Sequence, residues 1–277
     1  MSAMTYKPIK KKNNAVVLLA GLGLALGAMY SLHRCSHSDT PWHPVASGGD
    51  TVDVAIEYSP MSFYSYKDTL GGFNYDMLRI IARRHGITLK FHPIVSLSQS
   101  LEYIDDNTYD ILAADLPATA DFKERYTLLE PVLLDKQVLV QRRDTTSGEP
   151  HIKSQLDLAG DTVWIVEGST VESRIANLGR EIGDTIYMRF EPEYGAEQLF
   201  LMVATGEIGN AVISERVARD LAKDYPDVDI STNISFTQFQ SWIISEKRPS
   251  LSDSLNLWIR DFKTTREYDA LLKRYIK

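Results

Sequence analysis

The sequence predicts an α/β protein made of two lobes that are joined by two extended chain crossings and enclose a cleft. Two observations support this prediction. From Thr51 onward, short apolar strands alternate with amphipathic helices in the order β-α-β-α-β, and the same order begins again near Asp161, after a Gly/Pro/Ser-containing break at 145–154. Each such unit is typical of a mainly parallel sheet covered by helices. The chain has 277 residues, which is enough for two modest domains.

The first β-α-β-α-β unit follows directly from the pattern of apolar residues. Its predicted order is strand 51–59, helix 71–86, strand 87–95, helix 96–109 and strand 110–115. In the first helix Phe73, Met77 and Ile81 recur at helical spacing, and Gly86 suits a C-terminal cap. The second helix begins at Ser96, a residue type whose side chain caps helix N-termini.

The second unit repeats this architecture without repeating the sequence. Its predicted order is strand, glycine turn and helix over 161–179, strand 184–192, helix 195–208, strand 209–214 and helix 215–225. Strands 133–144 and 234–246 lead into and out of it, and two helices end the chain. The last of these carries Trp258, Ile259 and Phe262 on one face, which predicts core or inter-lobe packing.

These boundaries assign 51–140 and 240–277 to lobe 1, and 141–239 to lobe 2. Sheets of this type bind ligands in the crevice outside the C-terminal ends of their strands. The cleft is therefore the predicted binding site.

Composition excludes several classes of function. The net charge is −7, and the first 50 residues hold five Lys/Arg against two Asp/Glu, which leaves 25 against 35, or −10, for the remainder. Such an acidic body lacks the clustered cations that phosphate contacts need, so no nucleic-acid partner is expected. The single cysteine excludes an internal disulfide framework and a cysteine-built zinc site. No cofactor and no metal site are predicted, and the histidines between 33 and 50 are interpreted as solvated linker residues.

The N-terminal segment differs in kind from the body. Residues 1–14 form a basic segment, 15–32 are eighteen uncharged and mainly apolar residues, and 33–50 form a linker. Eighteen residues are close to the ~20 that span a bilayer. The preceding lysines place the basic segment in the cytoplasm and the body in the periplasm.

Three interpretations of the apolar segment 15–32 remain: an uncleaved anchor, a cleaved signal peptide and a lipoprotein signal. We favour an uncleaved signal anchor, that is, one N-terminal transmembrane helix in the inner membrane. Cleavage near Ala25-Leu26-Gly27 would instead release a soluble periplasmic form. Lipidation at Cys35 ranks third, because Arg34 stands where lipoprotein signals require a small residue.

Five stretches resemble the family-3 extracellular (periplasmic) solute-binding proteins in order and spacing. They are 54–82, 109–141, 157–178, 199–218 and 235–244, and the resemblance covers roughly 51–277. Within this family the chain resembles in particular the subgroup whose domain forms the N-terminal half of membrane-bound lytic murein transglycosylase F. The resemblance implies a type II periplasmic-binding-protein fold with a hinge that closes on a small ligand.

The resemblance also implies site residues in the first lobe. Glu57, Tyr58 and Phe63 match the pocket wall of that lobe, and Thr119 matches a polar ligand contact in the bend after strand 110–115. The arginine that grips the ligand carboxylate in amino-acid-binding members falls on Phe122. Two readings remain open for Phe122, a pocket wall or a residue that packs beneath the bend. For Glu57 the alternative is a solvent-exposed carboxylate at a strand end.

In the second lobe, Gly168, Ser169 and Thr170 match a turn that contacts the ligand carboxylate at a helix N-terminus, a geometry that favours anions in general. These three residues could also simply cap the helix. Ser214 stands where the family has an aspartate for the ligand ammonium, and it is followed by Glu215. Ser214 and Glu215 could likewise be no more than a helix N-terminus.

The loss of both charged anchors argues against an ordinary free amino acid. A bidentate Arg–carboxylate pair is directional, and neither Phe nor Lys reproduces it. We therefore expect a larger ligand, such as a peptide, a muropeptide or an amino-acid derivative. The expected partners are an ABC permease or a cell-wall enzyme acting in trans.

Two alternatives to a ligand-capturing protein stay open: a transglycosylase F-like cell-wall enzyme, and a degenerate binding fold that acts as an adaptor. Residues 167–173 do not form a nucleophile elbow, since the glycine–serine spacing is wrong. No helical domain with a general-acid glutamate follows 277 in this sequence. No catalytic residue is predicted, and we expect a binding protein rather than an enzyme.

Overall fold

A computed structural model describes residues 51–67 and 69–276, which belong to one compact unit. The predicted basic segment, transmembrane helix and linker lie outside the described residues. Within 51–67 and 69–276, no helix is both long and apolar enough to cross a membrane.

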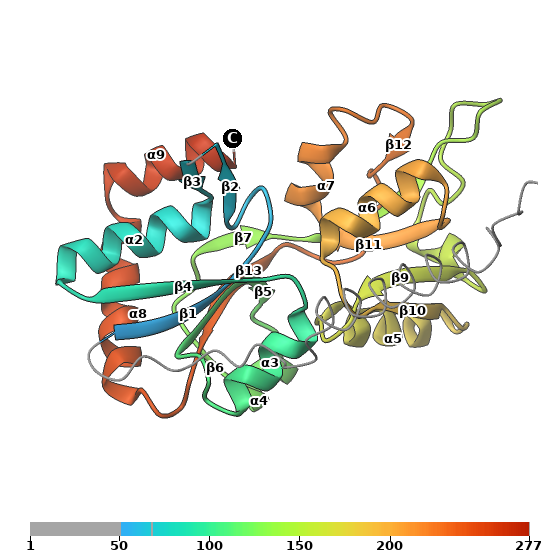
Figure 1. The fold of residues 1–277 in the computed structure, drawn as a ribbon. Coiled ribbons are helices and arrows are strands. Elements are labelled where there is room, and N and C mark those ends of the chain that lie inside the picture. The colour runs from blue at the N-terminus through green and yellow to red at the C-terminus, as the bar shows by residue number, and fades with distance from the viewer. Residues whose placement is uncertain (1–50, 68, 277) are drawn as a thin grey trace, which may run out of the picture. The chain divides into compact units, whose positions relative to one another are not determined.

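The first sheet contains the N-terminal strands and one late strand (Figure 1). Its order is β4 (Thr88–Ile94), β1 (Thr51–Glu57), β5 (Ile111–Pro117), β13 (Gln238–Ile244) and β6 (Thr127–Leu128), with β7 (Leu133–Asp135) also pairing with β13. Strands β4, β1 and β5 are parallel, as the β-α-β-α-β pattern predicts, and β13 is antiparallel to its neighbours. Its helices are α2 (Phe73–His85), α3 (Leu97–Asp105), α4 (Ala120–Arg125), α8 (Pro249–Lys263) and α9 (Arg266–Tyr275).

The second sheet has the order β10 (Tyr187–Glu191), β9 (Thr162–Val166), β11 (Asn210–Ser214), β8 (Gln137–Arg142) and β12 (Val228–Asp229). Strands β10, β9 and β11 are parallel, and β8 runs antiparallel to β11. The helices of this lobe are the short η1 (Gln155–Leu158), α5 (Val171–Ile182), α6 (Ala196–Thr205) and α7 (Glu215–Leu221).

The lobe boundary differs from the prediction at the first crossing. The apolar run 133–144 predicts one continuous strand, and the predicted boundary places 51–140 in lobe 1. In the structure the run is divided at Lys136 into β7, in the first sheet, and β8, in the second. Val138 and Val140 pack among α6 and α7, while Leu139 packs in the cluster beneath α5. Residues 137–140 therefore belong to lobe 2, because both faces of this strand are buried there.

Two further elements correct the expected order. A hairpin of β2 (Tyr64–Tyr66) and β3 (Thr69–Gly71) precedes α2 and was not predicted, because its strands are only three residues long. Trp258, Ile259 and Phe262 lie on α8 rather than on the last helix. Ile259 and Phe262 are buried in the core and Trp258 packs against it, so the expected packing role is confirmed.

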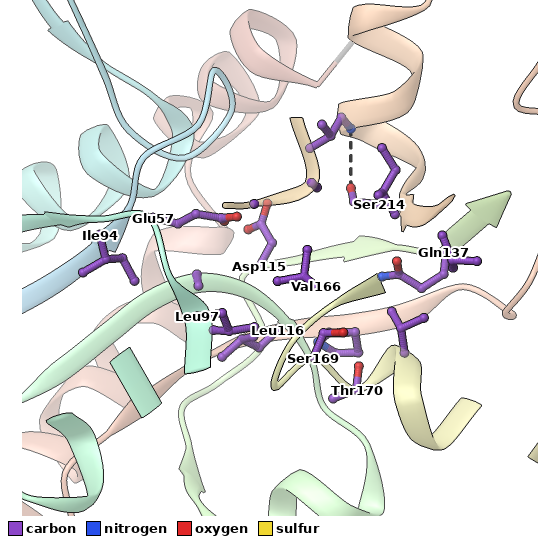
Figure 2. A pocket seen from close by; sticks show the side chains of 18 of the residues that line it. Glu57, Ile94, Leu97, Asp115, Leu116, Gln137, Val166, Ser169, Thr170 and Ser214 are labelled. Carbon is purple, nitrogen blue, oxygen red and sulfur yellow. Dashed lines mark hydrogen bonds between the residues drawn. The ribbon is translucent and has the colours of Figure 1, made fainter. Parts of the chain in front are cut away.

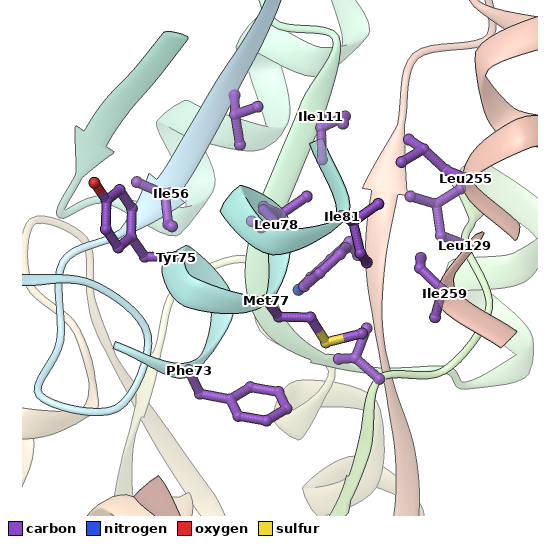
Figure 3. Close-up of a cluster of buried hydrophobic side chains, with 14 of the residues drawn as sticks. Ile56, Phe73, Tyr75, Met77, Leu78, Ile81, Ile111, Leu129, Leu255 and Ile259 are labelled. Carbon is purple, nitrogen blue, oxygen red and sulfur yellow. The ribbon is translucent and has the colours of Figure 1, made fainter. Parts of the chain in front are cut away.

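Each lobe buries apolar side chains on both faces of its sheet. In lobe 1, one cluster joins the sheet to α2, α8 and α9 (Figure 3), and a second joins it to α3. Trp242 on β13 is fully buried, and its indole N–H donates to Asn74 Oδ1 at 3.0 Å. These packed layers fix the C-terminal ends of the parallel strands, and the candidate site lies at those ends.

Candidate functional site

A cavity of about 80 Å³ lies where the parallel strands of both sheets end. Glu57 ends β1, Val166 ends β9 and Ser214 ends β11, so the strand ends of both lobes face one space (Figure 2). Aliphatic side chains form most of the wall, among them Ile94, Leu97, Leu116, Val166, Val171, Val212, Ile213 and Val217. The polar residues of the wall are Glu57, Asp115, Gln137, Ser169, Thr170 and Ser214. The cavity therefore suits a small guest with an apolar part and a few hydrogen-bonding groups.

A buried ion-pair network adjoins this cavity. Arg216, at the start of α7, donates from Nη2 to Asp115 Oδ2 at 2.6 Å, and its Nε lies 3.2 Å from Asp135 Oδ2. The side chain of Arg216 is 8% exposed and that of Asp135 is 2% exposed. Burial by itself lowers the pKa of Arg216, but Asp115 and Asp135 raise it, so the guanidinium stays charged.

The network extends from the cavity wall into the core of lobe 1. Ser214 Oγ donates to Asp135 Oδ2 at 2.5 Å. On the other side, Asn74 Nδ2 donates to Asp115 Oδ1 at 3.2 Å, and Asn74 in turn accepts from Trp242. Burial raises the pKa of Asp135, and attraction to Arg216 together with the Ser214 hydrogen bond offsets only part of that rise.

Glu57 is the carboxyl group in the cleft with the most strongly shifted ionisation. Figure 2 shows its side chain directed toward Asp115. Burial, and next the charge of Asp115, raise the pKa of Glu57 to about 7, while the Asp115 backbone N–H and the charge of Arg216 lower it. Near neutral pH this carboxyl can therefore be either protonated or ionised, and a guest that donates a hydrogen bond would favour the ionised form.

The turn after β9 brings three predicted residues together. Gly168 has φ +77°, and a Cβ built there would lie 3.3 Å from Ser98 Cα and from Leu101 Cδ1 of the opposite lobe. Ser169 and Thr170 line the cavity. Ser169 Oγ is buried without a hydrogen-bond partner in the described part of the chain, and Thr170 makes no side-chain cap bond to α5. The alternative that these residues only cap α5 is therefore not supported by any side-chain hydrogen bond. The Ser169 hydroxyl is available to bind a guest.

A second cavity, of about 250 Å³, shares Glu57, Val95, Gly195, Ala196 and Val217 with the first. Tyr58 from lobe 1 and Tyr194 from lobe 2 line it, and these side chains are 48% and 50% exposed. A guest too long for the inner cavity could extend into this outer one.

Four predicted site residues are not among those that line either cavity: Gly168, described above, and three residues of lobe 1. Phe63 is 5% exposed and packs edge-on against Tyr75, with ring centroids 5.3 Å apart. Thr119 is the N-cap of α4, where its Oγ1 accepts from the Phe122 N–H. Phe122 is half-buried and packs against Tyr126 at 5.4 Å, beside the cluster under α3. Of the two readings of Phe122, this placement fits packing beneath the bend.

Four residues of the site were not predicted from the sequence: Asp115, Gln137, Asp135 and Arg216. Asp115 offered a signal, because it is a charged residue within the otherwise apolar end of strand 110–115. Arg216 offered none, since an arginine in the first turn of a helix normally faces solvent. The described residues contain no group of three or more His, Cys, Asp or Glu arranged to hold a metal ion.

Residues 51–277 match the family described as bacterial extracellular solute-binding proteins, family 3. The chain belongs to this family. Its two lobes, two crossings and shared cavity at the strand ends agree with the expected fold, so the prediction of a periplasmic-binding-protein fold is confirmed for the body.

Similar curated relatives of this family-3 protein are named membrane-bound lytic murein transglycosylase F. The relative from Saccharophagus degradans is 25% identical over 260 residues, which cover 93% of this chain and 50% of the relative. The relative from Desulfosudis oleivorans is 25% identical over 271 residues, covering 97% and 57%. The expected likeness to this subgroup is confirmed, and the chain spans about half the length of the curated relatives that it matches.

Solved structures confirm the fold of the family-3 body. An ancestral arginine-binding protein bound to arginine has a TM-score of 0.71 and 19% identity, over 83% of this chain and all of the other. The holo arginine-binding protein from T. maritima has a TM-score of 0.65 and 21% identity, over 82% and 96%.

Proposed function

We propose that this family-3 protein is a membrane-tethered periplasmic solute-binding protein that captures a small ligand by closing its two lobes. The observation that carries the proposal is the cavity built by both lobes, with Glu57 and Asp115 on one side and Ser169 and Ser214 on the other. A ligand that touches both walls stabilises the closed form over the open one, which is what closure requires.

The wall chemistry supports a ligand other than an ordinary free amino acid. Most of the wall is aliphatic. In lobe 1, the position of the family's ligand-binding arginine is occupied by Phe122, which packs against Tyr126 and is not part of the cavity wall. The turn 168–170 and the N-terminus of α5 offer hydrogen bonds to a carboxylate or carbonyl. The outer cavity with Tyr58 and Tyr194 extends the available space. A peptide, a muropeptide or an amino-acid derivative fits these features.

The location and partners rest on the N-terminal sequence and the relatives. The basic and apolar segments over 1–32, and the membrane-bound relatives, support a body held in the periplasm by a single inner-membrane anchor. A tethered binding protein can deliver its ligand to an ABC permease, or signal occupancy to a cell-wall enzyme in trans. No catalytic role is proposed for the body.

Ser169 provides the decisive test. Its hydroxyl is buried and unpartnered, so Ser169→Ala should leave the ligand-free protein as stable as wild type or more stable. A hydrogen bond contributes about 0.5–1.5 kcal/mol, so the variant should bind a cleft ligand roughly 2- to 12-fold more weakly.

The measurement is a thermal-shift screen of the full chain with free amino acids, peptides and muropeptides, followed by calorimetry on any compound that raises the melting temperature. A ligand at 100 times its dissociation constant adds about 2.7 kcal/mol of stability, which is readily seen. Ser250→Ala, on the exposed first turn of α8, is the matched control and should bind like wild type. If every compound class leaves the melting temperature unmoved, or if Ser169→Ala binds its ligand like wild type, the proposal fails.

The adaptor alternative has one observation in its favour. The inner cavity is only about 80 Å³, and the lobes already contact each other through Arg216 and Asp115. A degenerate cleft of this kind would give no shift in the same screen, whereas a capturing cleft would.

A further inference from the structure

Arg216 links the two lobes through a buried charge. It belongs to lobe 2, Asp115 belongs to lobe 1, and Asp135 ends β7 at the first crossing between the lobes. Asp115 and Asp135 are largely shielded from water in the closed form, so without Arg216 their charge would be uncompensated there and opening, which admits water to Asp115, would be favoured. Removing one member of a buried pair is strongly unfavourable, because the remaining charge is uncompensated.

Neutral contacts accompany this ion pair across the cleft. Ser96 Oγ, at the N-terminus of α3, donates to the Pro192 carbonyl of lobe 2 at 2.8 Å. The turn at Gly168 approaches α3 so closely that a Cβ there would lie 3.3 Å from Ser98 and Leu101. These contacts join residues of the two lobes directly, so they favour closure in addition to the contacts that a ligand makes.

The same guanidinium sets the charge of the cleft. Glu57, Asp115 and Asp135 would be three neighbouring carboxyl groups without it, and such a cluster attracts a cation. Arg216 contacts two of the three and is almost fully buried. A guest ammonium would have to displace it to reach the same oxygens.

We infer that Arg216 is an internal counter-cation, which holds the lobes closed without ligand and keeps cationic ligand groups from binding at Asp115 and Asp135. Arg216 is thus a specificity-determining residue. Because it already favours the closed form, the ligand supplies only part of the free energy of closure. This inference goes beyond capture by closure, since it concerns the ligand-free protein.

Inter-lobe distance tests the closing role directly. Spin labels on the full chain at Glu102→Cys in α3 and Ala176→Cys in α5, with Cys35→Ser, report the distance between the lobes; both sites are exposed. Arg216→Ala and Asp115→Asn should each shift ligand-free protein toward longer distances. We expect the open-to-closed ratio to rise about tenfold, equivalent to about 1.4 kcal/mol.

Arg219→Ala is the matched control. Arg219 lies on the same helix, is 64% exposed and pairs with Glu215 of its own lobe, so its removal should leave the distance unchanged. Asp115→Asn keeps the test valid if Arg216→Ala folds poorly, because the Arg216–Asp135 contact remains. Wild-type distance distributions in the folded variants would overturn the closing role, whatever the ligand screen shows.

Small amines test the role in specificity. Ethylammonium chloride should raise the melting temperature of Arg216→Ala relative to the same concentration of sodium chloride, because the freed carboxylates can bind it. Wild type and Arg219→Ala should show no such difference. If ethylammonium has the same effect on all three proteins, Arg216 does not exclude cations and this part of the inference is wrong.

Discussion

Glu57 shows how one side chain can tie the stability of the body to pH. The raised pKa of about 7 means that the folded protein keeps a proton that the unfolded chain releases near pH 4.5. Between these values the folded state binds more protons, so its stability falls as the pH rises, and the loss is complete above pH 7. Burial next to Asp115 is the cause.

Glu57→Gln should therefore stabilise the protein at pH 8 by about 1–2 kcal/mol, since one pKa unit corresponds to about 1.4 kcal/mol and partial solvation reduces the full value. At pH 5 the difference should be much smaller, because Glu57 of the folded protein is then protonated and resembles glutamine. Urea unfolding at both pH values measures this. Glu102→Gln, on the exposed face of α3, should show no such pH-dependent gain, and a Glu57→Gln effect equal at both pH values would contradict the assignment.

At the scale of elements, the turn between β9 and α5 combines backbone geometry with inter-lobe contact. Gly168 and Gly183 have nearly equal φ values, +77° and +75°. A Cβ at Gly168 would crowd Ser98 and Leu101 of the opposite lobe, whereas a Cβ at Gly183 would meet nothing within 4 Å. Alanine at either position would be strained by the positive φ, but only alanine at Gly168 would also press on the opposite lobe. Comparing the two variants therefore distinguishes backbone strain from inter-lobe contact.

Gly168→Ala and Gly183→Ala should each cost about 1 kcal/mol in the free energy of unfolding, because alanine is strained at positive φ. Only Gly168→Ala should also lengthen the distance between labels on α3 and α5, since its methyl group presses on the other lobe. Denaturant unfolding and the spin-label distance give both readouts. Equal distances in the two variants would show that the turn does not bear on closure.

At the scale of the whole molecule, the two-lobed body has the fold of the solute-binding proteins. Its cavity is built by strand ends and by the N-termini of α3, α5, α6 and α7, which is where sheets of this type bind ligands. The relatives named lytic murein transglycosylase F are about twice as long as the matched region. The activity that their name describes therefore need not belong to this body.

We expect the purified full chain to leave a peptidoglycan zymogram uncleared over the pH range in which it stays folded. Lysozyme in a parallel lane serves as the positive control for the gel. Clearing at the position of the chain, absent from a mock purification, would show an enzymatic activity and overturn the binding-only proposal.

The sequence predicted the elements better than the site. Apolar periodicity identified the parallel strands and the main helices, since each buries a face that the pattern displays. It placed residues 137–140 in the wrong lobe, because a continuous apolar run does not show where the chain changes sheets. It also missed the hairpin β2–β3, whose strands are too short to show a period.

Among the site residues, Glu57, Ser169, Thr170 and Ser214 line the inner cavity and Tyr58 lines the outer one. Their ligand contacts remain predictions. Phe63, Thr119 and Phe122 instead pack or cap within lobe 1, and homologous position alone does not reveal which way a side chain points.

The sequence by itself determined that the body consists of two α/β units with strand ends available for binding, because hydrophobic spacing is a local property of the chain. Only the tertiary structure showed that Arg216 of one lobe lies between Asp115 of the other and Asp135 of the crossing. These residues are far apart in sequence, and their pairing depends on how the two sheets close on each other.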